Sequence, residues 1–91
     1  MKDLLINGTR FLTTDAIADA ALAYVTVLNQ YHRSDTVRFP AVVEGRAAKA
    51  AVVLGPSTHL VVLDAPDVMP AGLDGASEAV DDLQRRLADF L

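Results

Sequence analysis

Apolar and polar residues alternate with a period of two between Thr36 and Glu44. One face of an extended chain would carry the apolar side chains of Val37, Phe39, Ala41 and Val43. This is the pattern of a half-buried strand. Pro40 interrupts it, because proline has no N–H to donate to a neighbouring strand. We therefore predict a strand over residues 36–44 that either lies at a sheet edge or carries a bulge at Pro40.

Two shorter apolar runs follow, Ala50–Leu54 and Leu60–Leu63, and both are rich in valine. The segment Gly55–Thr58 between them reads Gly-Pro-Ser-Thr, a combination typical of turns. We predict that the two runs form an antiparallel hairpin, to which residues 36–44 add a third strand. Neither run has polar residues at alternate positions near its centre. We therefore expect both faces of this hairpin to be covered by helices, another sheet or a partner chain.

Asn7 and Gly8 separate two apolar stretches near the start of the chain. Asn-Gly is the strongest short hairpin signal, because both residues tolerate a positive φ. A two-residue loop would create two cross-strand pairs, Ile6 with Thr9 and Leu4 with Phe11. The alternative is one longer strand with a bulge at Gly8.

The segment from Asp15 to His32 has the periodicity of a helix, and Thr13, Thr14 and Asp15 supply oxygens that can cap its start. Its polar stripe is narrow, and the opposite side holds Ile17, Ala20, Ala21, Tyr24, Leu28 and Tyr31. A helix that is apolar nearly all round is buried. We therefore expect it to pack on the sheet and also against a second neighbour.

A second helix is predicted from a cap at Ser77 to about Phe90. Its apolar stripe consists of Val80, Leu83, Leu87 and Phe90. The spacing of four residues also predicts two ion pairs along this helix, Asp81 with Arg85 and Asp82 with Arg86.

These elements predict a single α+β domain over residues 1–91, with an antiparallel sheet of about five strands in the order ββαβββα and two helices packed on it. If both helices cover the same face, Ala51, Val53 and Val61 remain exposed on the other. An isologous homodimer would bury that face. The candidate interface residues are Ala51, Val53, Val61, Leu63, Phe90 and Leu91.

The amino-acid composition limits the kinds of site and partner that we expect and suggests a cellular compartment. The chain has 91 residues, a formal net charge of −4 and no cysteine, and 52% of its residues are hydrophobic. The absence of cysteine excludes disulfides and thiolate metal sites, and the acidic balance argues against nucleic acid or an anionic membrane as partner. We see no signal peptide and no transmembrane stretch, and expect a cytoplasmic protein. Frequent alanine, with arginine favoured over lysine, suggests a bacterial source.

No residues have the spacing of a catalytic or metal site. Ser57 and His59 are close in sequence, but residues so near each other in a tight turn seldom point at one another, and triads are recognised by geometry. His32 and His59 lack the spacing of a zinc site. Asp64, Asp67 and Asp74 do not fit a calcium-binding loop, and no glycine-rich phosphate loop occurs. We expect no catalytic residue, metal or cofactor.

Charged and irregular stretches leave two alternatives open. Six acids and no lysine or arginine lie between Asp64 and Asp82, which is either a face for a basic partner or a solvated helix start. The segment Asp64–Gly75 is either a connector or a binding loop. Scattered cations, which are Arg33, Arg38, Arg46 and Lys49, are weak evidence for nucleic-acid binding.

The sequence therefore favours a small non-catalytic module that self-associates, as a homodimer, or binds another protein. The alternative is a small enzyme or ligand-binding protein with a pocket at a homodimer seam, which would use His59, Tyr24, Tyr31 or Arg38. A deep pocket with converging polar groups would favour the alternative, and an apolar patch would favour the module.

Overall fold

The structure is a computed structural model and describes residues 1–66 and 73–90. The elements along the chain are β1 (Lys2–Ile6), β2 (Thr9–Thr13), α1 (Asp15–Gln30), β3 (Asp35–Val43), β4 (Arg46–Leu54), β5 (Leu60–Asp64) and α2 (Ala76–Ala88). The five strands form one antiparallel sheet. The predicted α+β fold with the order ββαβββα is therefore confirmed.

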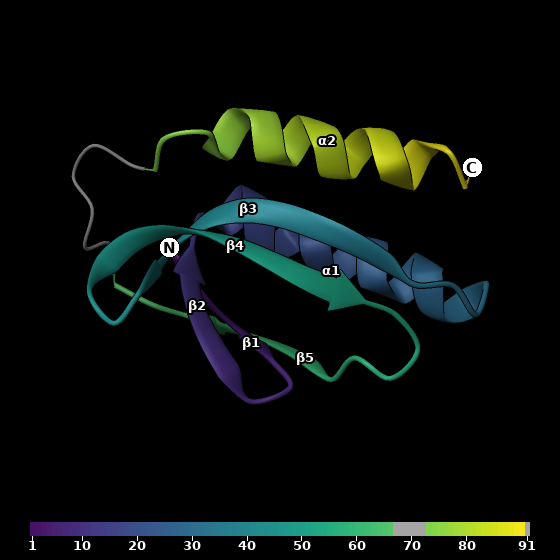
Figure 1. The fold of residues 1–91 in the computed structure, drawn as a ribbon, viewed down its shortest axis with the longest axis horizontal. Helices are drawn as coiled ribbons and strands as arrows, with labels where there is room; N and C mark the ends of the chain where they lie inside the picture. Colours follow the sequence, from purple (N-terminus) through teal and green to yellow (C-terminus); the bar gives the residue numbers. More distant parts are fainter. Residues whose placement is uncertain (67–72, 91) are drawn as a thin grey trace.

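Both helices pack against the same face of the sheet. In Figure 1, α2 runs alongside β3, and α1 lies behind β3 and β4 in this view. The helices contact each other, and α1 also contacts β1 and β5. The expectation that the alanine-rich helix has two neighbours is thus confirmed. One core cluster unites the sheet with the helices, and its large buried members include Leu4, Phe39, Ile17, Leu28 and Leu83.

Two tight turns build the β1–β2 and β3–β4 hairpins. Asn7 and Gly8 have φ angles of 50° and 88°, and Glu44 and Gly45 have φ angles of 52° and 78°. Positive φ at both central residues is the type I′ geometry that matches the twist of the flanking strands. The predicted pairs Ile6 with Thr9 and Leu4 with Phe11 are both present. The hairpin interpretation of Asn7-Gly8 is therefore confirmed.

The predicted hairpin between β4 and β5 is wrong. The strand order is β4-β3-β2-β1-β5, so β4 and β5 lie at opposite edges of the sheet, and β5 pairs with β1 instead. The N-terminal turn holds the chain there: the Asn7 N–H donates to the His59 carbonyl at 2.8 Å, and the His59 N–H donates to Asn7 Oδ1 at 2.7 Å. Short apolar strands suit either neighbour, so this contact between distant residues selects the partner.

The pairing of β2 with β3 is reduced to a single registered pair, Leu12 with Val42. The N-terminal half of β3 therefore extends beyond β2. Pro40 lies before Val42, among the residues of β3 that have no registered partner in β2. β3 is not an edge strand, and its register with β4 has no bulge at Pro40, so both predicted alternatives are wrong. The missing N–H of Pro40 costs nothing where the ladder has ended. Its carbonyl accepts a hydrogen bond of 2.9 Å from the buried Thr13 hydroxyl.

The start of α1 agrees with the prediction, but α1 ends at Gln30, two residues before the predicted His32, and the start of α2 also differs from the prediction. Thr14 caps α1, and its side chain accepts a hydrogen bond of 3.2 Å from the Ile17 N–H. Gly75 rather than Ser77 precedes α2, in a left-handed conformation with φ 84° and without a side-chain cap. Neither of the two described helices has the length and apolarity needed to cross a membrane.

The seam between β2 and β3 gives a first testable prediction. Replacing Thr13 by Val keeps the shape of the side chain but leaves the buried Pro40 carbonyl without its donor. We expect the free energy of unfolding to fall by about 1–3 kcal/mol, measured by chemical denaturation. Thr9→Val makes the same change at an exposed position of the same strand and should have little effect. Equal losses in both variants would contradict this role of Thr13.

Candidate functional site

The face of the sheet opposite the helices, called the outer face below, carries exposed apolar residues among those that the structure describes. On β1, Leu4 and Ile6 point into the core, so Leu5 points outward. Registered pairs extend this alternation across all five strands. They place one row on the outer face: Leu63, Asp3, Leu12, Val42 and Ala47. The buried residues of both helices belong to the core on the other side.

Four of the six candidate interface residues lie on this outer face. Val53 is 63% exposed and Leu63 is 48% exposed, which makes them two of the four large apolar residues that are exposed within the described chain. Ala51 is exposed and Val61 is half-buried. Ala51 and Val53 belong to β4, whereas Val61 and Leu63 belong to β5 at the opposite edge. The four therefore form two patches on one face rather than one cluster.

A shallow hollow of about 680 Å³ lies at the seam between these two patches. Leu12 and Val42, the single registered pair of β2 and β3, contribute to its floor. Charged residues of both signs also line it, and Arg10 lies 4.0 Å from Asp3. The outer face thus carries its exposed apolar residues at its two edges and charges of both signs around the hollow between them.

The other two candidate interface residues have different positions. Phe90 is half-buried at the end of α2, where its ring centre lies 5.1 Å from that of Tyr31 and 6.2 Å from that of Tyr24. The Arg33 guanidinium lies 5.8 Å from the same ring. Phe90 thus packs on the chain's own α1 and is not on the outer face. Leu91 lies outside the described residues.

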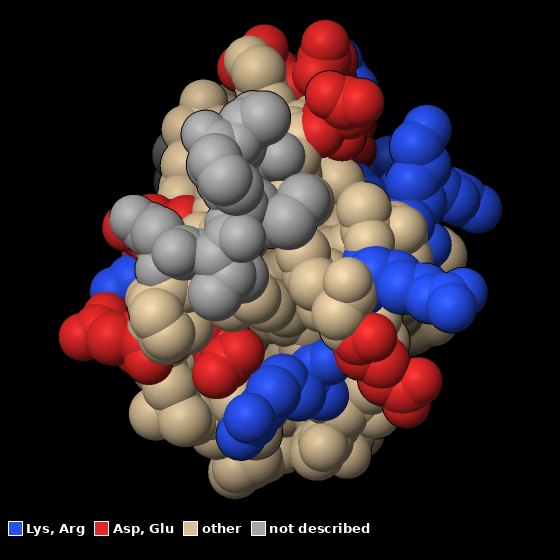
Figure 2. All heavy atoms as spheres, turned by 90° about the vertical axis from the view of Figure 1, so that its left-hand side faces the viewer, with Lys and Arg blue, Asp and Glu red and all other residues tan. Residues whose placement is uncertain are grey.

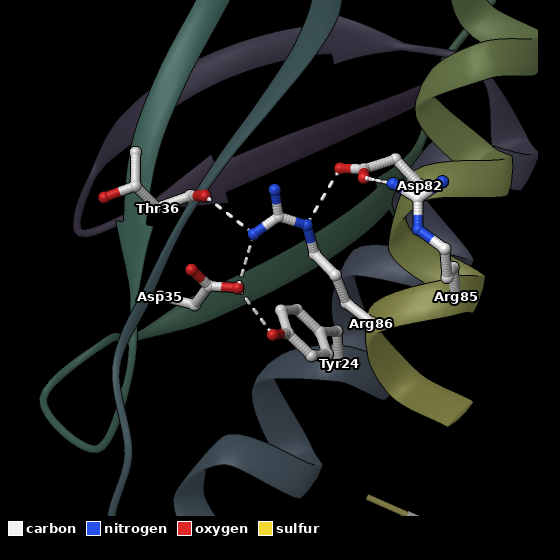
Figure 3. A network of polar contacts seen from close by, with 6 residues as sticks. All are labelled: Tyr24, Asp35, Thr36, Asp82, Arg85 and Arg86. Atoms are coloured by element: carbon white, nitrogen blue, oxygen red, sulfur yellow. Dashed lines mark hydrogen bonds and ion pairs between the residues drawn. The ribbon is translucent and has the colours of Figure 1, made fainter. Parts of the chain in front are cut away.

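A polar network joins α1, α2 and β3 at the other side of the molecule (Figure 3). The Tyr24 hydroxyl donates to Asp35 Oδ2 at 2.6 Å, and Arg86 Nη1 donates to the same oxygen at 2.7 Å. Arg86 Nη1 also reaches the Thr36 carbonyl at 3.3 Å, and Arg86 Nε donates to Asp82 Oδ2 at 2.9 Å. Arg86 therefore binds the open edge of β3 to α2.

This network shifts the pKa values of its members. Burial opposes ionisation of Asp35, but the hydrogen bonds from Tyr24 and Arg86 outweigh it, so the pKa of Asp35 lies below its ordinary value. Burial, followed by the hydrogen bond to Asp35, raises the pKa of Tyr24 to about 12. Hydrogen bonding to Asp35 raises the pKa of Arg86. Asp35 is therefore held as a carboxylate, Tyr24 as a phenol and Arg86 as a cation. These states suit a structural role, and we call the network of Tyr24, Asp35, Asp82 and Arg86 the clamp below.

A hollow of about 530 Å³ adjoins the clamp and is lined by Tyr24, Asp35, Arg86, Arg33, Phe90 and four further residues. Two of its polar groups, Asp35 and Arg86, are already bonded to each other and to neighbours. A catalytic base or an anion-binding cation needs a free lone pair or donor directed at the ligand. The clamp directs these groups at each other, so we assign it to positioning α2 on β3.

The residues named for an enzyme or ligand site do not converge. Tyr24 and Tyr31 both lie near Phe90, and His59 lies beside the Asn7 turn. Arg38 lines a separate hollow between β3 and α2. No hydrogen bond joins Ser57 to His59 among the described residues, and within residues 1–66 and 73–90 no three His, Asp or Glu residues are grouped as a metal site.

Cations from elsewhere in the chain accompany the acidic residues between Asp64 and Asp82. Lys2 pairs with Asp64, and Arg85 and Arg86 both pair with Asp82. The predicted pair of Asp82 with Arg86 is confirmed, whereas Arg85 reaches Asp82 three residues away.

Two further described acids of this stretch also lie among cations. Asp74 and Glu78 line the same hollow as Arg38 and Lys49. On the side of the molecule drawn in Figure 2, acidic and basic side chains are interspersed. These described acids thus do not form the single-sign face for a basic partner. Asp67 lies outside the described residues, as does half of the segment Asp64–Gly75.

The chain matches no protein-family model, and neither the curated proteins nor the solved structures contain a similar one.

The clamp predicts an asymmetry between two adjacent arginines. Arg86→Lys loses the planar fork that joins Asp35, Asp82 and the Thr36 carbonyl at once. Since Arg86 and Asp35 are each roughly one-third exposed, we expect the free energy of unfolding to fall by about 1 kcal/mol rather than by the full value of a buried charged bond. Arg85→Lys, at a mostly exposed position in the same helix, should be nearly neutral. Equal effects in denaturation experiments would refute the clamp.

The lowered pKa of Asp35 predicts a pH dependence with a definite sign. The ionised carboxylate stabilises the fold above the unfolded pKa of about 3.9, and this contribution is lost as the pH falls through the lower folded pKa. Asp35→Asn should therefore lose less stability than the wild type between neutral and strongly acidic pH. Asp81→Asn removes a charge from an exposed position of α2 and should keep the wild-type slope. An unchanged slope in Asp35→Asn would show that Asp35 does not contribute.

Proposed function

We propose that this protein is a small non-catalytic module that acts by associating with a second copy of itself through the exposed strands of its sheet. The observation that carries the proposal is the exposure of Val53 and Leu63, two large apolar residues at the two edges of the outer face. Large exposed apolar patches on a small protein mark interaction sites. A small chain with 52% hydrophobic residues has few other ways to hide them.

The charges on the outer face favour a second copy as the partner. Arg10 and Lys49 project from this face together with Asp3, and Glu44 lies at the adjacent turn. Because both signs are present, a two-fold axis can bring cations of one copy to anions of the other. A strongly basic or acidic partner would instead meet a like charge on part of the surface. Composition supports a bacterial cytoplasmic setting, and we include it in the proposal.

Ligand binding at a dimer seam has less support. Its residues lie in three places, and the two tyrosines among them pack against Phe90. The hollow beside Asp35 lies on the helix side of the molecule and not on the outer face. A seam formed by the outer face would therefore not include it.

The proposal predicts a concentration-dependent mass. Light scattering after size exclusion should give a dimer at high concentration, dissociating to monomer over roughly a hundredfold dilution. A chain that stays monomeric throughout would contradict the proposed function.

Substitutions then test the surface. Val53→Lys places a charge on the β4 side of the apolar outer face, and we expect it to raise the dissociation constant by about tenfold or more. Leu22→Lys is the matched control, because Leu22 is also an exposed large apolar residue, at 43%, but lies on α1. If only Leu22→Lys weakened the dimer, the contact would lie on the helices and not on the sheet.

A further inference from the structure

Strand β4 ends the sheet with a nine-residue edge, Arg46–Leu54. Val43 and Arg46 flank the two-residue turn and therefore form a hydrogen-bonded pair, after which bonded and non-bonded pairs alternate. The even-numbered residues of β4 thus bond to β3. The odd-numbered residues direct their backbone N–H and C=O groups away from the sheet, and they are Ala47, Lys49, Ala51 and Val53.

Two contacts agree with this alternation. Thr36 is paired with Val53, and its carbonyl faces away from β4 because it accepts the Arg86 donor on α2. The Val53 carbonyl likewise faces away from β3, since it accepts a long bond of 3.4 Å from the Thr58 hydroxyl. A carbonyl oxygen has a second lone pair, so this bond leaves Val53 able to accept another.

The β4 edge has few of the features that prevent edge pairing. Proteins protect edges with short strands, prolines, bulges, charges or covering elements. β4 is long, contains no proline and runs in unbroken register with β3. Seven of its nine residues are apolar, and most of the strand is exposed. β5, at the other edge, has only five residues and ends at the Lys2–Asp64 ion pair.

We propose that β4 pairs antiparallel with β4 of a second copy about a two-fold axis at Ala50, which joins the two sheets into one. This inference rests on the proposed function and names the part of the surface that makes the contact. The axis at Ala50 is the register in which all nine residues of each strand overlap. It brings the outward-facing backbone groups of both strands into hydrogen-bonded pairs.

The side chains fit this register. Ala47 lies opposite the second copy's Val53, and Ala48 lies opposite its Val52, so a small residue meets a larger one at each position. Lys49 lies opposite Ala51 of the second copy. An axis at Lys49 would instead place the two lysines directly opposite each other, which is unfavourable. The register therefore covers part of Val53 without facing like charges.

Amide hydrogen exchange of the wild-type chain tests the proposal directly. At concentrations at which light scattering shows dimer, the amides of Ala47, Lys49, Ala51 and Val53 should be protected, and their protection should fall on dilution to monomer. The amides of Ala48, Ala50 and Val52 should be protected at both concentrations because they bond to β3. Fast exchange of the odd-numbered amides in a proven dimer would overturn the edge pairing while leaving the proposed function intact.

A pair of variants provides the second test. Ala51→Pro removes one outward N–H at a position where an edge strand tolerates proline, and it should abolish the dimer. Ala51→Val keeps the N–H and should still dimerise. If Ala51→Pro dimerises like the wild type, the edge pairing is wrong. If Ala51→Pro does not fold, the exchange pattern of the wild type decides. A wild-type chain that is monomeric at every concentration overturns the proposed function and this inference together.

Discussion

The organisation of this protein depends on the early end of the ladder between β2 and β3. With a single registered pair at that seam, the residues of β3 before Val42 have backbone groups that no strand satisfies. Such groups are costly when buried without a partner. Thr13 satisfies the Pro40 carbonyl and Arg86 satisfies the Thr36 carbonyl. Arg86 belongs to α2, so its bond to the exposed Thr36 carbonyl helps to hold α2 beside β3.

The clamp around Asp35 extends the same constraint to α1. Asp35 begins β3, and its carboxylate accepts hydrogen bonds from Tyr24 on α1 and Arg86 on α2. One residue thus ties three elements together on the side of the sheet that holds the core. Both helices lie on this side of the sheet, and each contributes buried residues to the one hydrophobic core cluster. The consequence is an outer face whose apolar residues the described helices do not cover.

Local patterns in the sequence were sufficient for the elements and for their type. The Asn7-Gly8 turn, the cap at Thr14 and the alternation before Pro40 each act through residues a few positions apart, so they can be recognised without a structure. Local patterns were not sufficient to predict which strands lie next to each other in the sheet. The apolar runs of β4 and β5 resemble a hairpin, but β5 joins β1 because Asn7 and His59, far apart in sequence, exchange hydrogen bonds. The clamp could not be predicted from local patterns either, because Asp35 and Arg86 are 51 residues apart in the sequence.

The sequence by itself determined the order of the elements and the face that each strand turns to the core, because hydrophobic periodicity and turn chemistry are local. It also indicated an excess of apolar residues on the other face. Only the tertiary structure decided that these residues lie in two patches at opposite edges, and that Phe90 belongs to the helices. Which edge each strand occupies is set by contacts between distant residues, and such contacts leave no periodic signal in the chain.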